Sequence, residues 1–187
     1  MTADRDVAVR RIDPRDEDLA GSITALVNRA YAPAVLELWT ILFDRVSADT
    51  VADYIAAGEL LVAESKGTAI GCVRYRELDS DTGWFGLLAT DPDHAGSGAA
   101  RMLIDAVEEI AAGTGHKWME LDLLIPAVAT PHQSRLQDWY ARLGYVEISR
   151  EDFRMSDDAL AAAIRSPCVA IRERKLLNSP VRGVRGE

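Results

Sequence analysis

The sequence WFGLLATDPDHAGSGAARMLIDAVEEIAA, residues 84–112, passes from the pattern of a strand to that of a helix across a short glycine turn. The apolar run 84–89 is short and a proline soon follows, which predicts a strand. From Ala99 onward the apolar residues recur at helical spacing, until Gly113 and Gly115 end the pattern. A strand, a tight turn and a helix are therefore expected in this order.

The turn Gly96-Ser97-Gly98 precedes the expected helix directly. The first N–H groups of a helix have no partner within it and lie at the positive end of its dipole. Glycines let a ligand approach those groups closely, so this pattern favours a phosphate or pyrophosphate site. A Rossmann motif is excluded because Arg101 stands at the third glycine position, and a P-loop is excluded because no Lys-Ser/Thr pair follows.

The stretch resembles motif A of the GCN5-related N-acetyltransferase (GNAT) superfamily, V-x-P-x-x-[Q/R]-G-x-G-[G/A]. The residues that fall in register with this motif are Thr90, Pro92, Gly96, Gly98 and Ala100. Two basic positions of the motif are changed, because Ala95 precedes the first glycine and Ser97 stands between the two. Both changes remove side-chain contacts to phosphate and leave the backbone donors in place.

A second motif lies in residues 139–145, WYARLGY, which resemble GNAT motif B, [F/L/W]-Y-x-x-x-G-[F/Y]. Gln133 stands where many family members carry Asn. The two motifs lie about 40 residues apart in the family order, which makes the pair far more specific than either one. The resemblance covers roughly residues 7–174.

The resemblance implies an α/β fold with a mixed, mostly antiparallel sheet, flanked by helices and split into a V between the fourth and fifth strands. The family binds acetyl-CoA or another acyl-CoA in this split. Backbone groups of Leu88 and Thr90 are expected to pair with the pantetheine arm, and the turn is expected to hold the pyrophosphate. The expected cofactor-binding residues are Leu88, Ala89, Thr90, His94, Ala95, Gly96, Ser97, Gly98, Ala99, Ala100, Arg101 and Gln133.

Tyr140 matches the family tyrosine that protonates the leaving CoA thiolate. A phenol has a reference pKa of about 10 and a thiol of about 8.5, so a tyrosine beside the sulfur is protonated at neutral pH. The alternative is an aromatic side chain that only packs. The family also uses a general base to take a proton from the acceptor amine, and the candidates here are Glu120, Asp122 and His132.

Residues 118–125 alternate in the manner of a strand, which places Glu120 and Asp122 on one face. Two carboxylates there can accept a proton or hold a cationic substrate. The competing interpretation is a solvated or salt-bridged pair.

The composition fits one globular domain, with 187 residues, of which 48% are hydrophobic and 27% charged. A net charge of −9 disfavours nonspecific binding to nucleic acid. No apolar run approaches the ~20 residues that span a bilayer. The N-terminus does not resemble a signal peptide, so we expect a cytoplasmic protein without a membrane partner. Cys72 and Cys168 are interpreted as small buried hydrophobic residues, and no metal site is expected.

We expect a domain over residues 7–176 between flexible termini at 1–6 and 177–187. The remaining strands are predicted at residues 7–12, 60–64, 68–76, 118–125, 145–153 and 168–174. The helices are predicted at residues 17–30, 48–57, 99–112, 135–143 and 156–164. The first helix is expected to break at residues 31–33. The apolar segment 35–43 either shapes an acceptor pocket or packs in the core.

These observations predict an acyl-CoA-dependent N-acyltransferase that moves an acetyl group directly to an amine in a ternary complex. The amine can belong to a small molecule or to a protein. A homodimer is an expectation from the family. The alternative is a degenerate GNAT-fold module that binds acyl-CoA, or regulates, without turnover.

Overall fold

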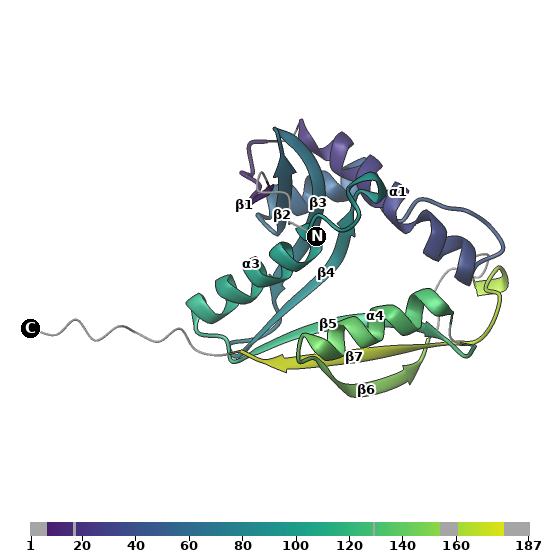
Figure 1. The fold of residues 1–187 in the computed structure, drawn as a ribbon. Coiled ribbons are helices and arrows are strands. Elements are labelled where there is room, and N and C mark those ends of the chain that lie inside the picture. The colour runs from purple at the N-terminus through teal and green to yellow at the C-terminus, as the bar shows by residue number, and fades with distance from the viewer. Residues whose placement is uncertain (1–6, 17, 129, 154–160, 178–187) are drawn as a thin grey trace, which may run out of the picture.

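The computed structural model describes residues 7–16, 18–128, 130–153 and 161–177. Helices and strands follow one another in the order that the sequence predicts (Figure 1). The elements are β1 (Val7–Arg11), α1 (Leu19–Leu38), α2 (Ala48–Ala56), β2 (Leu60–Ser65), β3 (Thr68–Glu77), β4 (Thr82–Thr90), the short 3-10 helix η1 (Pro92–His94), α3 (Ala99–Thr114), β5 (Trp118–Pro126), α4 (Pro131–Arg142), β6 (Val146–Asp152) and β7 (Cys168–Leu176).

The described strands form one seven-stranded sheet in the order β1-β2-β3-β4-β5-β7-β6. All neighbours are antiparallel except β4 and β5, which are parallel. These two strands pair only where Thr82–Trp84 meets Trp118–Glu120, and they then separate into two arms (Figure 1). The predicted α/β fold, with its mostly antiparallel sheet and its V-shaped split, is confirmed.

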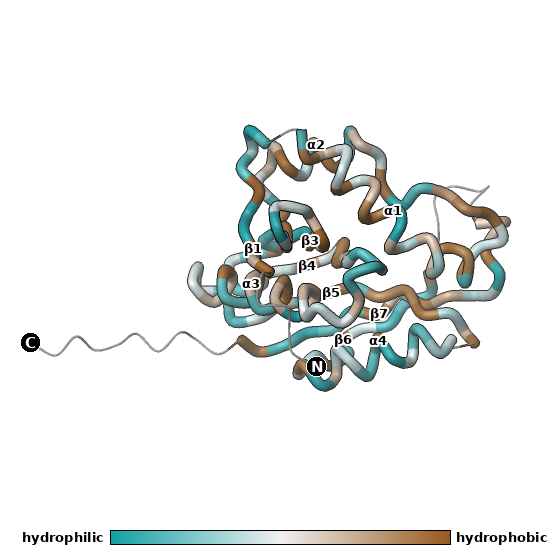
Figure 2. The backbone as a smooth tube through the Cα atoms, turned by 45° about the horizontal axis from the view of Figure 1, so that its top comes forward, coloured by the Kyte–Doolittle hydropathy of each residue, from teal (hydrophilic) through white to brown (hydrophobic). Residues whose placement is uncertain are grey.

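The first arm of the sheet comprises β1 to β4, and each of its faces carries its own helices. Along β2, Leu61 and Ala63 belong to the core cluster with α3, whereas Leu60 and Val62 belong to the cluster with α1 and α2. This alternation follows from the two-residue period of a strand. Figure 2 shows α1 and α2 together on one side of the strands, with hydrophobic residues recurring along both helices.

The first helix differs from the prediction, because α1 continues through Pro33 to Leu38. A proline inside a helix removes one hydrogen bond and costs about 3 kcal/mol in a helix interior. Tertiary packing offsets this cost. The residues beyond the proline enter a third core cluster, whose buried members are Val35, Leu38, Trp39, Ala163 and Cys168. The segment 35–43 thus packs partly in the core, which was one of its two predicted roles. Its residues Ile41 and Leu42 are exposed.

Capping residues explain where α2 and α4 begin. Ser47 caps α2, since its Oγ accepts a hydrogen bond from the Thr50 N–H at 3.1 Å. The predicted start of the helix at residues 135–143 was wrong, because α4 begins at Pro131. Thr130 caps it and the proline takes the first helical position, where no N–H is needed.

Most of the predicted helix 156–164 and residues 178–187 of the predicted tail lie outside the described residues. Leu177, the first residue assigned to that tail, is instead buried, and its N–H donates to the Lys117 carbonyl at 2.8 Å. Within the part of the chain that the structure describes, no helix has the length and apolar character needed to cross a membrane.

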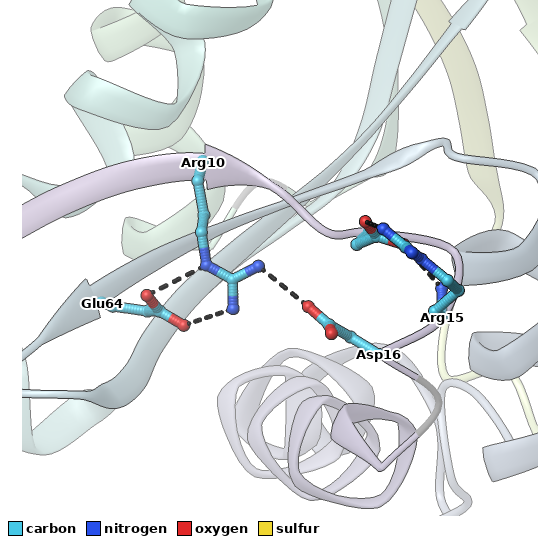
Figure 3. A network of polar contacts seen from close by, with 5 residues as sticks. Arg10, Arg15, Asp16 and Glu64 are labelled. Carbon is cyan, nitrogen blue, oxygen red and sulfur yellow. Dashed lines mark hydrogen bonds and ion pairs between the residues drawn. The ribbon is translucent and has the colours of Figure 1, made fainter.

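An ion-pair network ties the edge strand β1 to its surroundings (Figure 3). Arg10 donates to both carboxylate oxygens of Glu64 on β2, at 2.8 and 3.2 Å, and to Asp16 at 3.2 Å. Arg15 pairs with Asp13 at 2.7 Å in the connection to α1. All these contacts are exposed, so they orient the edge strand and the entry to α1 more than they stabilise the fold.

Candidate functional site

The split begins at a bulge in β4. Cys72 pairs with Ala89 and Arg74 pairs with Gly86, so β4 contains one residue more than β3 between these pairs. Leu87, inside the bulge, has a φ of 51°. A bulge bends its strand and leaves backbone groups unpaired. The bulge lies just beyond Trp84, the last β4 residue that pairs with β5, and therefore bends β4 where the two arms separate.

The glycine turn has the backbone that an anion site requires. Gly96 and Gly98 have φ values of 82° and 88°, a region in which other residues are strained. Gly98 is the N-cap of α3 and has no side chain that can cap the helix. Ser97 Oγ accepts from the Ala99 N–H, at 3.3 Å. The first turn of the 16-residue helix α3 thus presents its positive end at this turn.

A cation from α1 pairs with the acidic residues that precede this turn, and the sequence analysis missed it. Arg29 pairs with Asp91, and its Nη1 lies 3.2 Å from Asp93 Oδ2. Arg101, which was expected to bind cofactor, instead pairs with Asp105 one helical turn later, at 2.8 Å. No local pattern announces the Arg29 contact, because 62 positions separate Arg29 from Asp91.

Tyr140 lies at the apex of the split, with 4% of its surface exposed. Its ring centroid is 6.2 Å from that of Phe85, the first β4 residue after the β4–β5 pairs, and 5.1 Å from that of Trp139. Burial raises the pKa of Tyr140 well above its ordinary value, and the nearby Tyr31 and Glu173 raise it further. The phenol is therefore an acid that keeps its proton at neutral pH.

Tyr31 is a second tyrosine beside the split, and the sequence analysis assigned it only to a helix break. Its hydroxyl donates to the backbone carbonyl of Leu88 at 3.2 Å. Burial raises the pKa of Tyr31 to about 12. The carbonyl of Leu88, one of the groups expected to meet pantetheine, thus already has a donor in this structure.

The two β5 carboxylates lie on one face, and both are ion-paired. Glu120 is 3% exposed and accepts from Arg174 Nε at 2.7 Å. Asp122 accepts from Arg172 Nε at 2.8 Å and from the indole Nε1 of Trp84 at 3.0 Å. The last contact crosses the split from β5 to β4. In this structure, both carboxylates are therefore held by arginines.

His132 and Gln133, the other two predicted site residues on α4, lie in its first turn. His132 is exposed, whereas Gln133 is buried and donates its N–H to the Thr130 cap. Eight residues separate His132 from Tyr140, which corresponds to about 12 Å along a helix. The structure thus brings Tyr140 to the apex of the split and leaves His132 two turns away from it.

The indole of Trp84 leaves no room for a side chain at Gly86. A Cβ on Gly86 would lie 2.6 Å from Cζ2 of that indole, which lies along β4 over the glycine. We expect Gly86→Ala to displace the indole, break its hydrogen bond to Asp122 and lower the free energy of unfolding by about 1–3 kcal/mol. Denaturant titration and the NMR signal of the indole N–H measure these effects.

A matched glycine provides the control. A Cβ on Gly113, inside α3, would meet no atom within 4 Å, so Gly113→Ala is expected to stabilise the protein by about 0.5–1 kcal/mol. If Gly86→Ala left both the stability and the indole signal unchanged, the placement of Trp84 described above would be wrong.

The cysteines have the predicted character. Cys72 and Cys168 are both buried and unbridged, and burial raises the pKa of the Cys72 thiol to about 12. Among the residues that the structure describes, no group of three or more His, Cys, Asp or Glu side chains is arranged to hold a metal ion.

A comparison with known protein families finds a match. Residues 56–147 match the family described as an acetyltransferase (GNAT) domain. A comparison with curated protein sequences finds no significant match.

Several solved structures share the fold. Ard1 from Thermoplasma volcanium is 14% identical, with a TM-score of 0.67 over 92% of this chain and 99% of that one. The ribosomal-protein-S18-alanine N-acetyltransferase from Escherichia coli is 16% identical, with a TM-score of 0.66 over 95% and 98% of the two chains. YncA from Salmonella typhimurium, a putative acetyltransferase solved with acetyl-CoA, is 18% identical, with a TM-score of 0.64 over 95% and 97%. The solved structures show a shared fold, and the family match places residues 56–147, which contain the glycine turn and the start of the split, in the GCN5-related N-acetyltransferase superfamily.

Proposed function

We propose that this chain transfers an acetyl group from acetyl-CoA to an amine, and that the acyltransferase domain comprises residues 7–176. One observation carries the proposal. The split of the sheet leads from the glycine turn, with the positive end of α3, to the buried hydroxyl-bearing ring of Tyr140 at the apex. A pyrophosphate at the turn and a thioester near the apex fit the two ends of this path.

The proposed transfer is direct. The free amine attacks the thioester carbonyl, a C–N bond forms, and the C–S bond breaks with its electron pair on sulfur. Tyr140 gives its proton to that thiolate, and the proton lost by the amine restores the phenol through a base or water. Holding the amine and the thioester together supplies much of the rate. Glu120, Asp122 and His132 remain the candidates for the base, and Glu120 and Asp122 must act from within their ion pairs.

Two measurements test the proposal. Acetyl-CoA and CoA should each raise the melting temperature, as expected of ligands that bind the folded state only. Release of CoA thiol from acetyl-CoA should then depend on an added amine. A rise in melting temperature without turnover on any amine would favour the degenerate binding module. The absence of any shift would contradict the acyl-CoA proposal itself.

Arg29 gives a sharper test of where the phosphates bind. Without Arg29, the carboxylates of Asp91 and Asp93, a few residues before the turn, lose their cation, so we expect Arg29→Gln to weaken the binding of CoA about tenfold. The variant should bind S-acetylpantetheine, which lacks the pyrophosphate, as the wild type does. Calorimetric titration of both ligands measures the difference.

A second substitution provides the control. Asp91 Oδ1 accepts from the Asp93 N–H at 2.9 Å, a role that an asparagine oxygen can also fill. Arg29→Gln combined with Asp91→Asn should therefore recover part of the lost affinity for CoA. An equal loss for CoA and S-acetylpantetheine would mean that Arg29 acts on the fold and not on the phosphates.

A further inference from the structure

A pocket of about 280 Å³ lies on the side of β3 and β4 that α1 and α2 cover. Side chains from the α1–α2 connection and α2 line it on one side, and side chains from β3 and β4 line it on the other. The residues that line the pocket include Asp44, Arg45, Tyr54, Arg74, Trp84 and Leu87. Leu87 is the bulge residue that precedes Leu88. The pocket therefore ends one residue from the backbone expected to hold the pantetheine arm.

Arg74 is the best-defined polar group of this pocket. Its guanidinium lies 3.7 Å from the ring centroid of Tyr54, and its Nε donates to Glu59 at 2.6 Å. The Arg74 side chain is 21% exposed. Neither Nη atom donates a hydrogen bond to any other residue within the described ranges. A planar guanidinium fixed by stacking and by one Nε contact presents its two remaining nitrogens in the geometry that suits a carboxylate.

The rest of the lining fits a small molecule that carries both charges. Arg45 adds a second guanidinium, 5.6 Å from the ring centroid of Tyr31. Asp44, beside it, contributes a carboxylate that can hold an ammonium group. The indole of Trp84 supplies an apolar wall on β4. Ligand pockets commonly measure about 300–1,000 Å³, so this volume, just below that range, suits a small ligand.

We propose that this pocket binds the acceptor, and that the acceptor is a free amino acid whose carboxylate binds Arg74. This inference rests on the proposed acetyltransferase function. With the carboxylate at Arg74 on β3, the amine extends toward Leu87 and the thioester. The nitrogen attacks the acetyl carbonyl, the C–S bond breaks, and CoA leaves with the proton from Tyr140. The proton lost by the amine restores the phenol of Tyr140 through the base or water. The products are an N-acetyl amino acid and CoA.

The experiment compares each standard amino acid with its own α-carboxamide, using acetyl-CoA as donor. The carboxamide has nearly the same size and lacks the negative charge. We expect kcat/KM for the preferred acid to exceed that for its amide by about 10- to 100-fold, the range for a charged hydrogen-bonded pair. In Arg74→Gln this preference should disappear, mainly through KM for the acid.

Arg76 provides the matched control. It lies two residues along the same face of β3, its guanidinium is 4.8 Å from the ring centroid of Trp84, and it does not line the pocket. Arg76→Gln should keep the preference for the acid. Arg74→Lys keeps the positive charge but loses the planar guanidinium, so it should show an intermediate preference. It also provides a second variant if Arg74→Gln does not fold. An unchanged shift in melting temperature with acetyl-CoA shows that a variant still has its donor site.

The outcomes separate the two proposals. If wild-type protein acetylates spermidine or a lysine peptide but shows no preference for acids over amides, the pocket assignment fails and the acetyltransferase stands. If acetyl-CoA binds without turnover, the test is the melting temperature of the CoA complex. The pocket assignment also fails if the acids raise this temperature no more than their amides do. If acetyl-CoA itself gives no shift, the proposed function fails first.

Discussion

Replacing Gly98 with glutamate is expected to abolish the rise in melting temperature that acetyl-CoA gives the wild-type protein, whereas alanine should only reduce it. Gly98 has a φ of 88°, so either residue is strained by about 1–2 kcal/mol. An added Cβ would meet no atom within 4 Å, so alanine brings strain without a clash. Glutamate also places a carboxylate at the positive end of α3, where the pyrophosphate is proposed to bind.

The pair of variants separates charge from strain. Two like charges about 4 Å apart near a protein surface repel by about 4 kcal/mol, so we expect the Kd for acetyl-CoA to rise by 100-fold or more in Gly98→Glu relative to Gly98→Ala. Calorimetric titration of both variants measures this ratio. Equal Kd values in the two variants would place the pyrophosphate away from this turn.

Tyr140→Phe is expected to lower kcat by about 100-fold or more while KM for acetyl-CoA stays within about threefold, because general acid catalysis contributes in this range. The phenylalanine ring keeps the contacts with Phe85 and Trp139. The structure gives the Tyr140 hydroxyl no hydrogen bond to any other described residue, so the free energy of unfolding should change by less than about 1 kcal/mol. Initial rates and denaturant titration measure both quantities.

The pKa of Tyr140 adds a pH test. Because burial raises this pKa above its ordinary value of 10, the wild-type phenol is protonated at both pH 7 and pH 9. The ratio of wild-type to variant kcat should therefore be the same at the two pH values. A ratio that falls at pH 9 would mean that the phenol ionises earlier than its burial implies.

Tyr145 gives the opposite pattern and serves as the control. It belongs to the same aromatic cluster, but its hydroxyl donates to Glu108 Oε1 at 2.8 Å. Tyr145→Phe should thus lower the free energy of unfolding by about 1.5–3 kcal/mol and leave kcat within a few-fold of the wild type. A loss of kcat as large as in Tyr140→Phe would indicate that the whole cluster, and not one hydroxyl, is responsible.

Local patterns were sufficient for the parts of the fold that depend on neighbouring residues. The glycine turn before α3 was predicted from adjacent residues, and the shared face of Glu120 and Asp122 was predicted from strand alternation. The split of the sheet came from the resemblance of two motifs, because no single stretch of sequence encodes the separation of two strands.

Contacts between distant segments explain what was missed. Helix α1 passes Pro33 because its end packs against Ala163 and Cys168, more than 120 positions away. Arg29 pairs with Asp91, and Arg174 pairs with Glu120, across 62 and 54 positions. A single sequence contains the charge of each partner but not their pairing. The same limit hid the pocket beside Arg74, whose lining comes from a loop, a helix and two strands.

The order of the strands also affects how the protein is made. β7 follows β6 in the sequence but lies between β5 and β6 in the sheet. Until residues 168–176 leave the ribosome, β6 lacks its partner strand and β5 is joined only to β4, over three residue pairs. Open strand edges are the parts of a nascent chain most prone to join other chains. The second arm of the split is therefore completed only when β7 inserts between β5 and β6.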